Sequence, residues 1–290
     1  MKDYLVRAIT TNKEIRALAV NSTKVVDAAQ KSHNTTAVAT AALGRTLTGA
    51  LLMGLLIKSG EEISITINCT GPIKSIIAQA NKYGEVRGYL ANPQLQFKTN
   101  KDGKLDVAQA VGAGQLTVRK RFAVKEPYES TIPLISGEIG EDLTYYYTQS
   151  EQTPSAVGLG VLVNNDQTVK SSGGFLIQLL PDAQNKTIEK LEKNISGLKS
   201  ISSLIDKGLT PEDLLEEVLQ GFDFRVMARK DVYFKCKCSR ERTKKLLYSL
   251  EQVELKDILE KKESVEIRCH FCGKEYEYQE SEIREILSSD

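Results

Sequence analysis

The 290-residue sequence has only two histidines, almost no net charge and no long apolar run, and each shortage excludes a class of protein. With only His33 and His270, no Ser-His-Asp arrangement for nucleophilic catalysis can be nominated. A formal charge of +1 provides no long-range field toward nucleic acid or an anionic membrane, so neither is an expected partner. The longest apolar stretch, Thr46 to Ile57, has about 12 residues against the roughly 20 that a membrane span needs, and it predicts a buried core helix.

Cysteine is also scarce over most of the chain. Cys69 is the only cysteine in the first 235 residues, and the other four fall within 37 residues near the C-terminal end: Cys236, Cys238, Cys269 and Cys272. Residues 1–7 lack the apolar core of a secretory signal, so a cytoplasmic location is expected. In a reducing cytosol, a group of cysteines like this one, the thiol cluster, indicates metal binding or redox chemistry rather than a disulfide framework.

The order of strand-like and helix-like segments predicts a β-rich N-terminal α+β domain over residues 1–181. Alternating residues predict a hairpin over residues 3–20. Two helices should follow, the first capped by Ser22 and the second capped by Asn34 or Thr35 and ending at Gly60. Further strands are expected at 63–67, 73–79, 86–90, 116–122, 158–163 and 174–180, with turns such as Asn100 to Gly103 between some of them. A helix is expected at 141–150.

Residues 182–230 predict a linker of short amphipathic helices. Apolar residues recur there at spacings of three and four, and between Lys186 and Lys230 eight basic residues balance eight acidic ones. Isolated short helices are marginal in water, so these helices need a neighbour on which to pack. The hypothesis is that they dock beside the C-terminal unit, and that loss of this unit would release their apolar faces.

Residues 231–290 predict a small zinc domain. A strand at 232–234, a helix opened by Ser239, a helix near 255–259 and a hairpin over 265–278 are expected there. Two close cysteine pairs, Cys-x-Cys and Cys-x-x-Cys, suit the tetrahedral coordination of one Zn²⁺ by four thiolates. The departure from common zinc ribbons is the single residue inside the first pair and the longer gap between the pairs. A site with four protein ligands has no open position for a substrate water, so zinc hydrolysis is not expected.

Two interpretations of the thiol cluster remain open. In the first, zinc has only a structural role and stabilises a domain that is too small to build much core. In the second, the cluster is a redox switch, because zinc-bound thiolates are oxidisable and close pairs can form disulfides locally. A Cys236–Cys238 disulfide would be strained and easily reduced, which suits a reversible device.

Other side chains are weaker candidates. His270 could replace one sulfur ligand, although four cysteines suffice. His33 is interpreted as a surface or capping residue, and Cys69 as a buried small hydrophobe. The run Tyr145 to Tyr147 suggests either core packing or an apolar contact surface, and Gly158 to Gly160 lacks the remainder of a phosphate-binding loop.

The thiol cluster resembles the zinc switch of a known family, the redox-regulated thirty-three-kilodalton heat-shock chaperonins, which are bacterial holdases. Segments along nearly the whole chain are also similar to family segments: Gly-Glu-Val-Arg-Gly-Tyr (84–89), Gln-Ser-Glu-Gln-Thr-Pro (149–154) and Gly-Gly-Phe-Leu-Ile-Gln-Leu-Leu-Pro (173–181).

The resemblance implies that the thiol cluster binds one Zn²⁺ per chain in the reduced state. It implies that oxidation pairs Cys236 with Cys238 and Cys269 with Cys272. It further implies that zinc loss destabilises the linker, that the exposed apolar surface holds unfolding client proteins without ATP, and that the active form can be a homodimer. The expected protein is a stress-response chaperone and not an enzyme.

Two rival functions are weighed against this expectation. A zinc-ribbon nucleic-acid binder is favoured by the basic residues Arg240, Arg242, Lys244 and Lys245, but residues 232–290 carry 12 basic and 13 acidic residues and so lack a basic footprint. A dithiol oxidoreductase could use Cys269 and Cys272, but such a site is expected to open a helix rather than lie in a hairpin turn.

Overall fold

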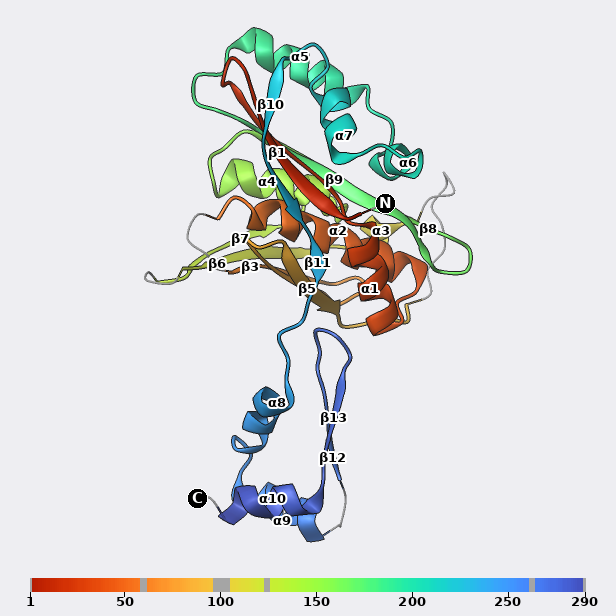
Figure 1. Cartoon of the computed structure of the whole chain (residues 1–290), viewed down its shortest axis with the longest axis vertical. Coiled ribbons are helices and arrows are strands. Elements are labelled where there is room, and N and C mark those ends of the chain that lie inside the picture. The colour runs from red at the N-terminus through yellow and green to blue at the C-terminus, as the bar shows by residue number, and fades with distance from the viewer. Residues whose placement is uncertain (1, 58–61, 96–104, 123–125, 261–263, 289–290) are drawn as a thin grey trace. The chain divides into compact units, whose positions relative to one another are not determined.

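A computed structural model describes residues 2–57, 62–95, 105–122, 126–260 and 264–288 (Figure 1). The chain divides into two compact units, an N-terminal unit of Met1–Lys235 and a C-terminal unit of Cys236–Asp290. This division falls later than the boundary expected at residue 231. The reason is that Tyr233 and Phe234 form strand β11, which pairs with a strand of the N-terminal unit.

The N-terminal unit contains two mainly antiparallel sheets. The five-stranded sheet has the order β10 (Phe224–Asp231), β1 (Tyr4–Thr10), β2 (Ile15–Asn21), β9 (Val169–Leu179) and β8 (Ser155–Val163). The six-stranded sheet has the order β11 (Tyr233–Phe234), β5 (Glu85–Leu90), β4 (Ser75–Asn81), β3 (Glu62–Cys69), β6 (Gly114–Arg121) and β7 (Tyr128–Pro133). Among the strands of the described residues, β11 alone pairs in parallel, with β5.

Helix α2 (Ala37–Gly54) forms the centre of the N-terminal unit. It contacts strands of both sheets and lies between them with α1 (Thr23–His33) beside it (Figure 1). Among the described helices it is the one long and apolar enough to cross a membrane, but 89% of this segment is buried inside the protein. The prediction of a core helix is therefore confirmed. The remaining helices of this layer are α3 (Val107–Val111) and α4 (Gly140–Gln149).

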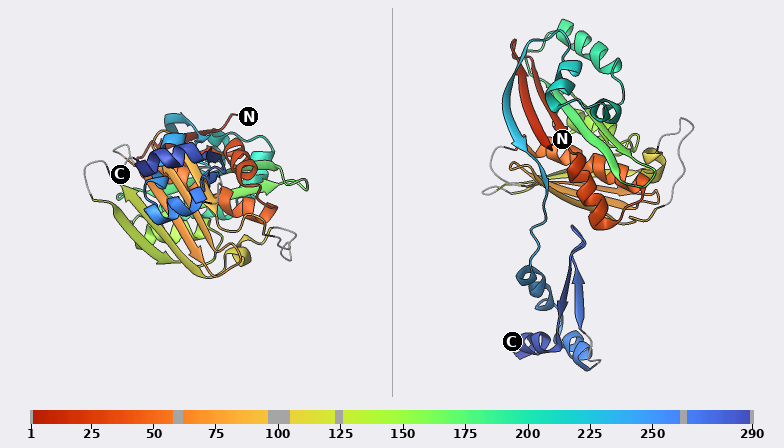
Figure 2. Two further views of the ribbon diagram at one scale, coloured as in Figure 1. Left: turned by 90° about the horizontal axis from the view of Figure 1, so that it is seen from below. Right: turned by 45° about the vertical axis from the view of Figure 1, so that its right-hand side comes forward.

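The linker region packs on the other face of the five-stranded sheet. Helices α5 (Asn185–Ser196), α6 (Ile201–Asp206) and α7 (Pro211–Val218), here called the helical cover, lie across this sheet (Figure 2, right). Side chains alternate along a strand, so one strand can serve both faces. In β1, Leu5 belongs to the core around α2, whereas Val6 and Ala8 belong to the core beneath the cover.

Polar contacts fasten the helical cover to the sheet. The Thr187 hydroxyl on α5 donates a hydrogen bond to Glu14, and the Tyr4 hydroxyl donates one to Glu212 Oε2 of α7 at 2.7 Å. Lys170 Nζ on β9 lies 2.8 Å from Asp206 Oδ2 of α6. The neighbour on which the linker helices pack is thus a sheet of the N-terminal unit, whereas sequence reasoning had expected the C-terminal unit.

Several expected elements are confirmed and some are wrong. The opening hairpin is β1 and β2, and the strands and helix predicted between residues 63 and 180 match β3 to β6, α4, β8 and β9 with small shifts at their ends. Helix α2 ends at Gly54, before the predicted Gly60, which lies outside the described residues together with the turn at 100–103. Residues 224–230 were expected to be helical but form β10 against β1, and the patterns of α3 and β7 were not recognised.

The C-terminal unit has its own small core. It consists of α8 (Arg240–Leu247), α9 (Gln252–Glu260), the hairpin β12 (Val265–Arg268) and β13 (Glu275–Tyr278), and α10 (Glu280–Ser288). The predicted helices and hairpin are confirmed, whereas α10 was not anticipated. The fully buried side chains of this core are few: Leu247, Leu255, Tyr276, Tyr278, Ile283 and Ile286.

The N-terminus of α1 is capped from a distant part of the chain. Ser22 precedes the helix, as expected, but its hydroxyl lies 2.8 Å from the Thr48 hydroxyl and makes no capping bond. Asp3 replaces it, because the Val25 N–H donates to Asp3 Oδ2 at 2.9 Å. Asp3 is only 5% exposed and its other oxygen, Oδ1, has no hydrogen-bond partner among the described residues. Burial is the main cause that raises the pKa of Asp3 to about 6, although the helix N–H groups oppose the shift.

Replacing Asp3 with Asn is expected to stabilise the protein above pH 6.5. The folded-state pKa of about 6 lies above the unfolded value of about 4, so the stability provided by the protonated carboxyl is lost as the pH rises from about 4 through 6. The advantage of Asn should grow over this interval to at most about 3 kcal/mol. Urea unfolding of both proteins across this range measures it, and a difference that does not change with pH would exclude the buried carboxyl as the cause.

Candidate metal centre

Two loops of the C-terminal unit carry the thiol cluster. Cys236 and Cys238 lie in the extended segment before α8, where the Ser239 hydroxyl accepts a hydrogen bond from the Arg242 N–H at 3.3 Å and caps the helix, as predicted. The Arg242 guanidinium donates to the Lys237 carbonyl at 2.8 Å and so fixes the residue between the two cysteines.

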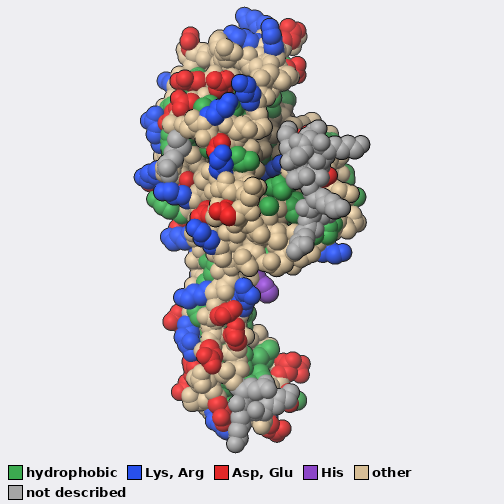
Figure 3. All heavy atoms as spheres, turned by 90° about the vertical axis from the view of Figure 1, so that its right-hand side faces the viewer, with side chains coloured by type: hydrophobic (Ala, Val, Ile, Leu, Met, Phe, Trp, Pro, Cys, Tyr) green, Lys and Arg blue, Asp and Glu red, His purple; other side chains and the backbone are tan. Residues whose placement is uncertain are grey.

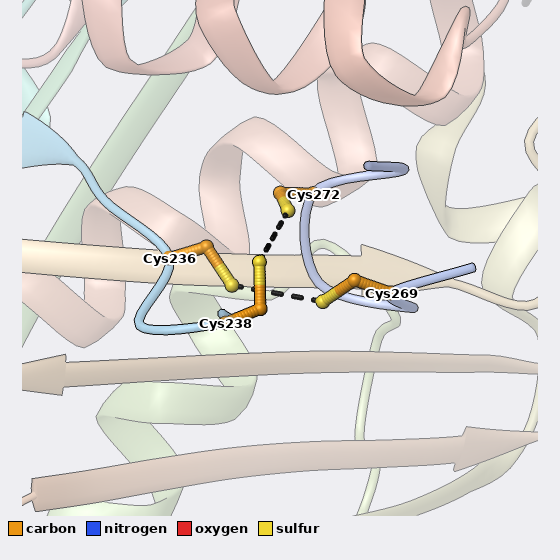
Figure 4. Close-up of side chains that lie close together, drawn as sticks. All are labelled: Cys236, Cys238, Cys269 and Cys272. Carbon is orange, nitrogen blue, oxygen red and sulfur yellow. Dashed lines mark hydrogen bonds between the residues drawn. The ribbon is translucent and has the colours of Figure 1, made fainter. Parts of the chain in front are cut away.

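The second cysteine pair lies in the turn between β12 and β13. The Cys269 N–H donates to the Lys274 carbonyl at 2.9 Å, and the Gly273 N–H donates to the Cys269 carbonyl at 2.8 Å. Gly273 has a φ of 69°, a left-handed conformation that glycine adopts without a steric penalty. This tight turn directs Cys269 and Cys272 toward the first pair (Figure 4).

All four sulfur atoms of the thiol cluster lie within 4.8 Å of one another. The Sγ atoms of Cys236 and Cys269 are 3.7 Å apart, and those of Cys238 and Cys272 are 3.4 Å apart (Figure 4). The cysteines are reduced and none forms a disulfide. Sequence reasoning placed these residues together from their spacing alone, and the fold brings all of them to one point.

The thiols of the cluster resist simultaneous ionisation. Burial opposes ionisation of Cys238, but hydrogen bonds from Tyr276 and from the other cysteines lower its pKa to about 7. Burial and the contact with Cys238 raise the pKa of Cys272, and burial also raises the pKa of Cys269. Several thiolates at these distances therefore require a cation to compensate their charge.

The arrangement fits a tetrahedral metal site with sulfur ligands. Zinc–sulfur bonds of about 2.3 Å place neighbouring sulfurs of a tetrahedron about 3.8 Å apart, close to the separations observed here. Among the described residues, the close group contains the four cysteines and not His270. The donor set is soft and closed, which suits a structural or regulatory zinc ion.

The other sequence candidates belong to the N-terminal unit. His33 ends α1, and its Nε2 atom lies 3.0 Å from the Gly88 carbonyl oxygen. Cys69 is partly buried rather than fully buried, because it lies at the end of β3, and its thiol donates to the Lys74 carbonyl at 3.4 Å. Of the tyrosine run, Tyr146 and Tyr147 are buried, so the core-packing interpretation holds for these two.

One residue of the site was missed by sequence reasoning. The Tyr276 hydroxyl donates a hydrogen bond to Cys238 Sγ at 3.2 Å. Tyr276 belongs to the hairpin that carries the second cysteine pair, yet it contacts a sulfur of the first pair. The available signal was its place four residues after Cys272 in a predicted strand, but only the folded hairpin identifies which sulfur it contacts.

A groove in the N-terminal unit has a volume of about 1260 Å³ and runs along strand β8. Its lining includes an ion pair between Arg45 and Glu138. No histidine or cysteine occurs among the lining residues that the structure describes. The groove therefore provides no second cluster of metal ligands or thiol nucleophiles.

Comparisons with known proteins agree over almost the entire chain. The model of the family described as Hsp33 protein matches residues 3–279. A 33 kDa chaperonin of Bacillus cytotoxicus is 43% identical over 290 residues, which is 100% of both chains. A 33 kDa chaperonin of Staphylococcus aureus strain JH9 is 45% identical over 288 residues, covering 99% of this chain and 98% of the relative.

A solved structure has the same fold. The crystal structure of the 33 kDa chaperonin, a heat shock protein 33 homologue, from Thermotoga maritima superposes with a TM-score of 0.94 at 36% identity. The match covers 100% of this chain and 99% of the Thermotoga chain.

The fold and the site define a class of protein: a mixed α+β chaperone with a C-terminal cluster of four cysteines. The chain belongs to the Hsp33 family. The expected family, fold class and chaperone function are thereby confirmed.

Proposed function

We propose that this chaperone is an ATP-independent holdase of the bacterial cytoplasm, activated by oxidation of a zinc-bound thiol cluster. The observation that carries the proposal is the placement of four reduced cysteine sulfurs within 4.8 Å of one another. In the reduced state Cys236, Cys238, Cys269 and Cys272 would hold one Zn²⁺ per chain. The bound ion would compensate the thiolate charge and link the segment before α8 to the β12–β13 hairpin.

Oxidation by a peroxide would convert the four thiolates into two disulfides. Each disulfide forms with transfer of two electrons to one peroxide molecule, whose two oxygen atoms leave as water after taking up protons. The proposed pairs are Cys236 with Cys238 and Cys269 with Cys272, which lie close in sequence. The shortest sulfur contacts in the reduced protein instead join the two loops, so peptide mapping of the oxidised protein is needed to decide the pairing.

Loss of the metal would unfold the C-terminal unit. Its core has few fully buried side chains, and a structural zinc ion contributes on the order of 10 kcal/mol to folding, more than the margin of a unit this small. The disulfides join residues within one loop each and do not replace the link between the two loops.

The chain path connects this event to the helical cover. Cys236 is separated from β11 only by Lys235, and β11 follows β10, which is the edge strand of the five-stranded sheet. Strand β10 in turn follows α7 of the cover, and Arg229 of β10 lies 2.6 Å from Glu212 of α7. Unfolding that spreads from Cys236 would loosen β11 and β10 and then the cover, because edge strands and short helices open at low cost.

We propose that the sheet face beneath the helical cover binds clients. This face is mainly apolar, and it includes the buried side chains Val6, Ala8, Ile15, Ala17, Ala19, Phe175 and Ile177. Released from the cover, it would expose a contiguous apolar patch of the kind that binds unfolded chains. Two such faces could also associate, which is consistent with a homodimer as the active form. Residues 1–181 would thus carry client binding, residues 182–230 would contain the removable cover, and residues 231–290 would contain most of the switch.

The rival functions find less support in the site. Arg240 of α8 is paired with Glu282 at 2.7 Å, and Lys244 lies 3.7 Å from Glu285, so the basic residues of this helix are partly neutralised. Lys, Arg, Asp and Glu side chains are interspersed over the face shown in Figure 3. Cys269 and Cys272 lie in a hairpin turn rather than at the start of a helix, where a dithiol oxidoreductase would gain a low thiol pKa.

The reduced protein is expected to bind one zinc ion per chain through the thiol cluster. Replacing any one of its cysteines with Ser should lower zinc affinity by at least about 100-fold, because one of the four metal ligands is lost. Competition with a chromophoric chelator measures the affinity, and Cys69→Ser serves as the matched control because Cys69 lies outside the cluster. Equal zinc binding by a cluster variant and the wild type would contradict the assignment of ligands.

Peroxide treatment with mild warming is expected to release zinc and to produce holdase activity at the same time. Both should reverse after reduction with zinc restored. Zinc release is followed with a chromophoric chelator, and activity by suppression of the aggregation of a thermally unfolding client. If activity is independent of oxidation, or if zinc stays bound while activity appears, the cluster has only a structural role and is not the switch.

Loosening the helical cover is expected to activate the reduced protein without zinc release. Leu215 of α7 is fully buried between the helical cover and the sheet. Leu215→Ala should weaken the packing of the cover by about 2–5 kcal/mol and raise the fraction of molecules with an open cover. Leu116→Ala is the matched control, because Leu116 is equally buried in the core around α2. The cover is not the regulator if both variants, or neither, suppress client aggregation in the reduced state.

A further inference from the structure

The thiol cluster receives its hydrogen bonds from unequal donors. In the Cys-x-x-Cys turn, the backbone N–H groups of Phe271 and Lys274 favour the ionised forms of Cys269 and Cys272 and oppose the rise of their pKa values. The first pair has one intervening residue and cannot form the same turn. There, Cys238 Sγ receives the side-chain hydroxyl of Tyr276 at 3.2 Å.

The Tyr276 hydroxyl is held rigidly in this position. Tyr276 lies on β13 opposite Ile267 of β12, and its side chain is only 6% exposed. Its ring belongs to the small core of the C-terminal unit, and Lys274 Nζ lies 5.1 Å from the ring centroid. Because packing fixes the ring, the hydroxyl needs little further ordering to donate to the sulfur.

We propose that Tyr276 is a positioning residue that holds the Cys238 thiolate in the cluster and thereby sets the oxidant threshold of the switch. The inference rests on the proposed function of the thiol cluster. A hydrogen bond to a thiolate stabilises its charge, orients it toward the metal and lowers its reactivity as a nucleophile. Cys238 is the member of the cluster to which this side-chain control applies.

The step that Tyr276 slows is attack on peroxide. The Cys238 thiolate forms a sulfur–oxygen bond while the oxygen–oxygen bond breaks, and one hydroxide leaves. A second thiolate of the cluster then displaces the remaining hydroxide from Cys238, which closes a disulfide and completes the two-electron oxidation. Donation by the Tyr276 hydroxyl draws charge from the attacking sulfur, so its removal should accelerate the first step.

The same hairpin offers a matched control. Tyr278 is also a buried tyrosine of β13 in the same small core. Its hydroxyl lies 2.6 Å from the Thr243 hydroxyl and donates to the Arg240 carbonyl at 2.7 Å. Both partners belong to α8, so this hydroxyl contacts the helix and not a sulfur of the cluster. Tyr276→Phe and Tyr278→Phe therefore each remove one buried hydroxyl, but only the first removes a sulfur contact.

The experiment uses the full-length reduced protein loaded with zinc, and in parallel with Co²⁺. Tyr276→Phe is expected to lower zinc affinity about tenfold, as is usual when a group that supports a metal ligand is removed. It should also raise the rate of peroxide-driven zinc release by a similar factor and shift the sulfur-to-cobalt charge-transfer band. Tyr278→Phe should leave the absorption band and the release rate unchanged.

The outcomes separate this inference from the proposed function. Equal changes in both variants, or an unchanged cobalt band and release rate in Tyr276→Phe, would overturn the role of Tyr276 even if the wild type releases zinc on oxidation. If the wild-type protein binds no zinc or keeps it under peroxide, the proposed switch itself fails.

Discussion

The electrostatic balance among four sulfur atoms is the constraint on which the C-terminal unit depends. Four thiols within 4.8 Å cannot all ionise unless a cation compensates them, and the small core beside them is too limited to replace such a link. A metal ion would therefore act as the centre of this unit. Thiolates that bind a metal are also oxidisable, so in the proposed switch both stability and sensitivity would arise from one group of atoms.

The five-stranded sheet has the complementary property of carrying two apolar faces. One face packs permanently against α2 in the largest core of the protein, whereas the other is closed by three short helices. Those helices are fastened by a few polar contacts, such as the bond from Tyr4 to Glu212. In the proposed function, release of the three helices would turn this apolar face into a binding surface without any change in the fold around α2.

Sequence reasoning found the fold class and the thiol cluster because both depend on local patterns. Alternating residues identified the hairpin of β1 and β2, and two close cysteine pairs predicted the cluster. It failed at Phe224 to Asp231, where a strand was taken for the end of a helical linker. The strand forms because β1 offers a free edge, and the backbone partner of a strand cannot be read from the strand itself. The cap of α1 was missed for the same reason, because Asp3 is far from Val25 in sequence.

The sequence by itself determined the chemistry of this protein, namely four closely spaced cysteine thiols, a chain with little net charge and a region of short amphipathic helices. Residue types and their spacing suffice for such properties. Only the tertiary structure decided that the helices cover a sheet of the N-terminal unit, that Cys236 is separated from β11 only by Lys235, and that Tyr276 contacts Cys238. These facts depend on contacts between residues that are distant in the chain, and such contacts exist only once the strands have found their partners.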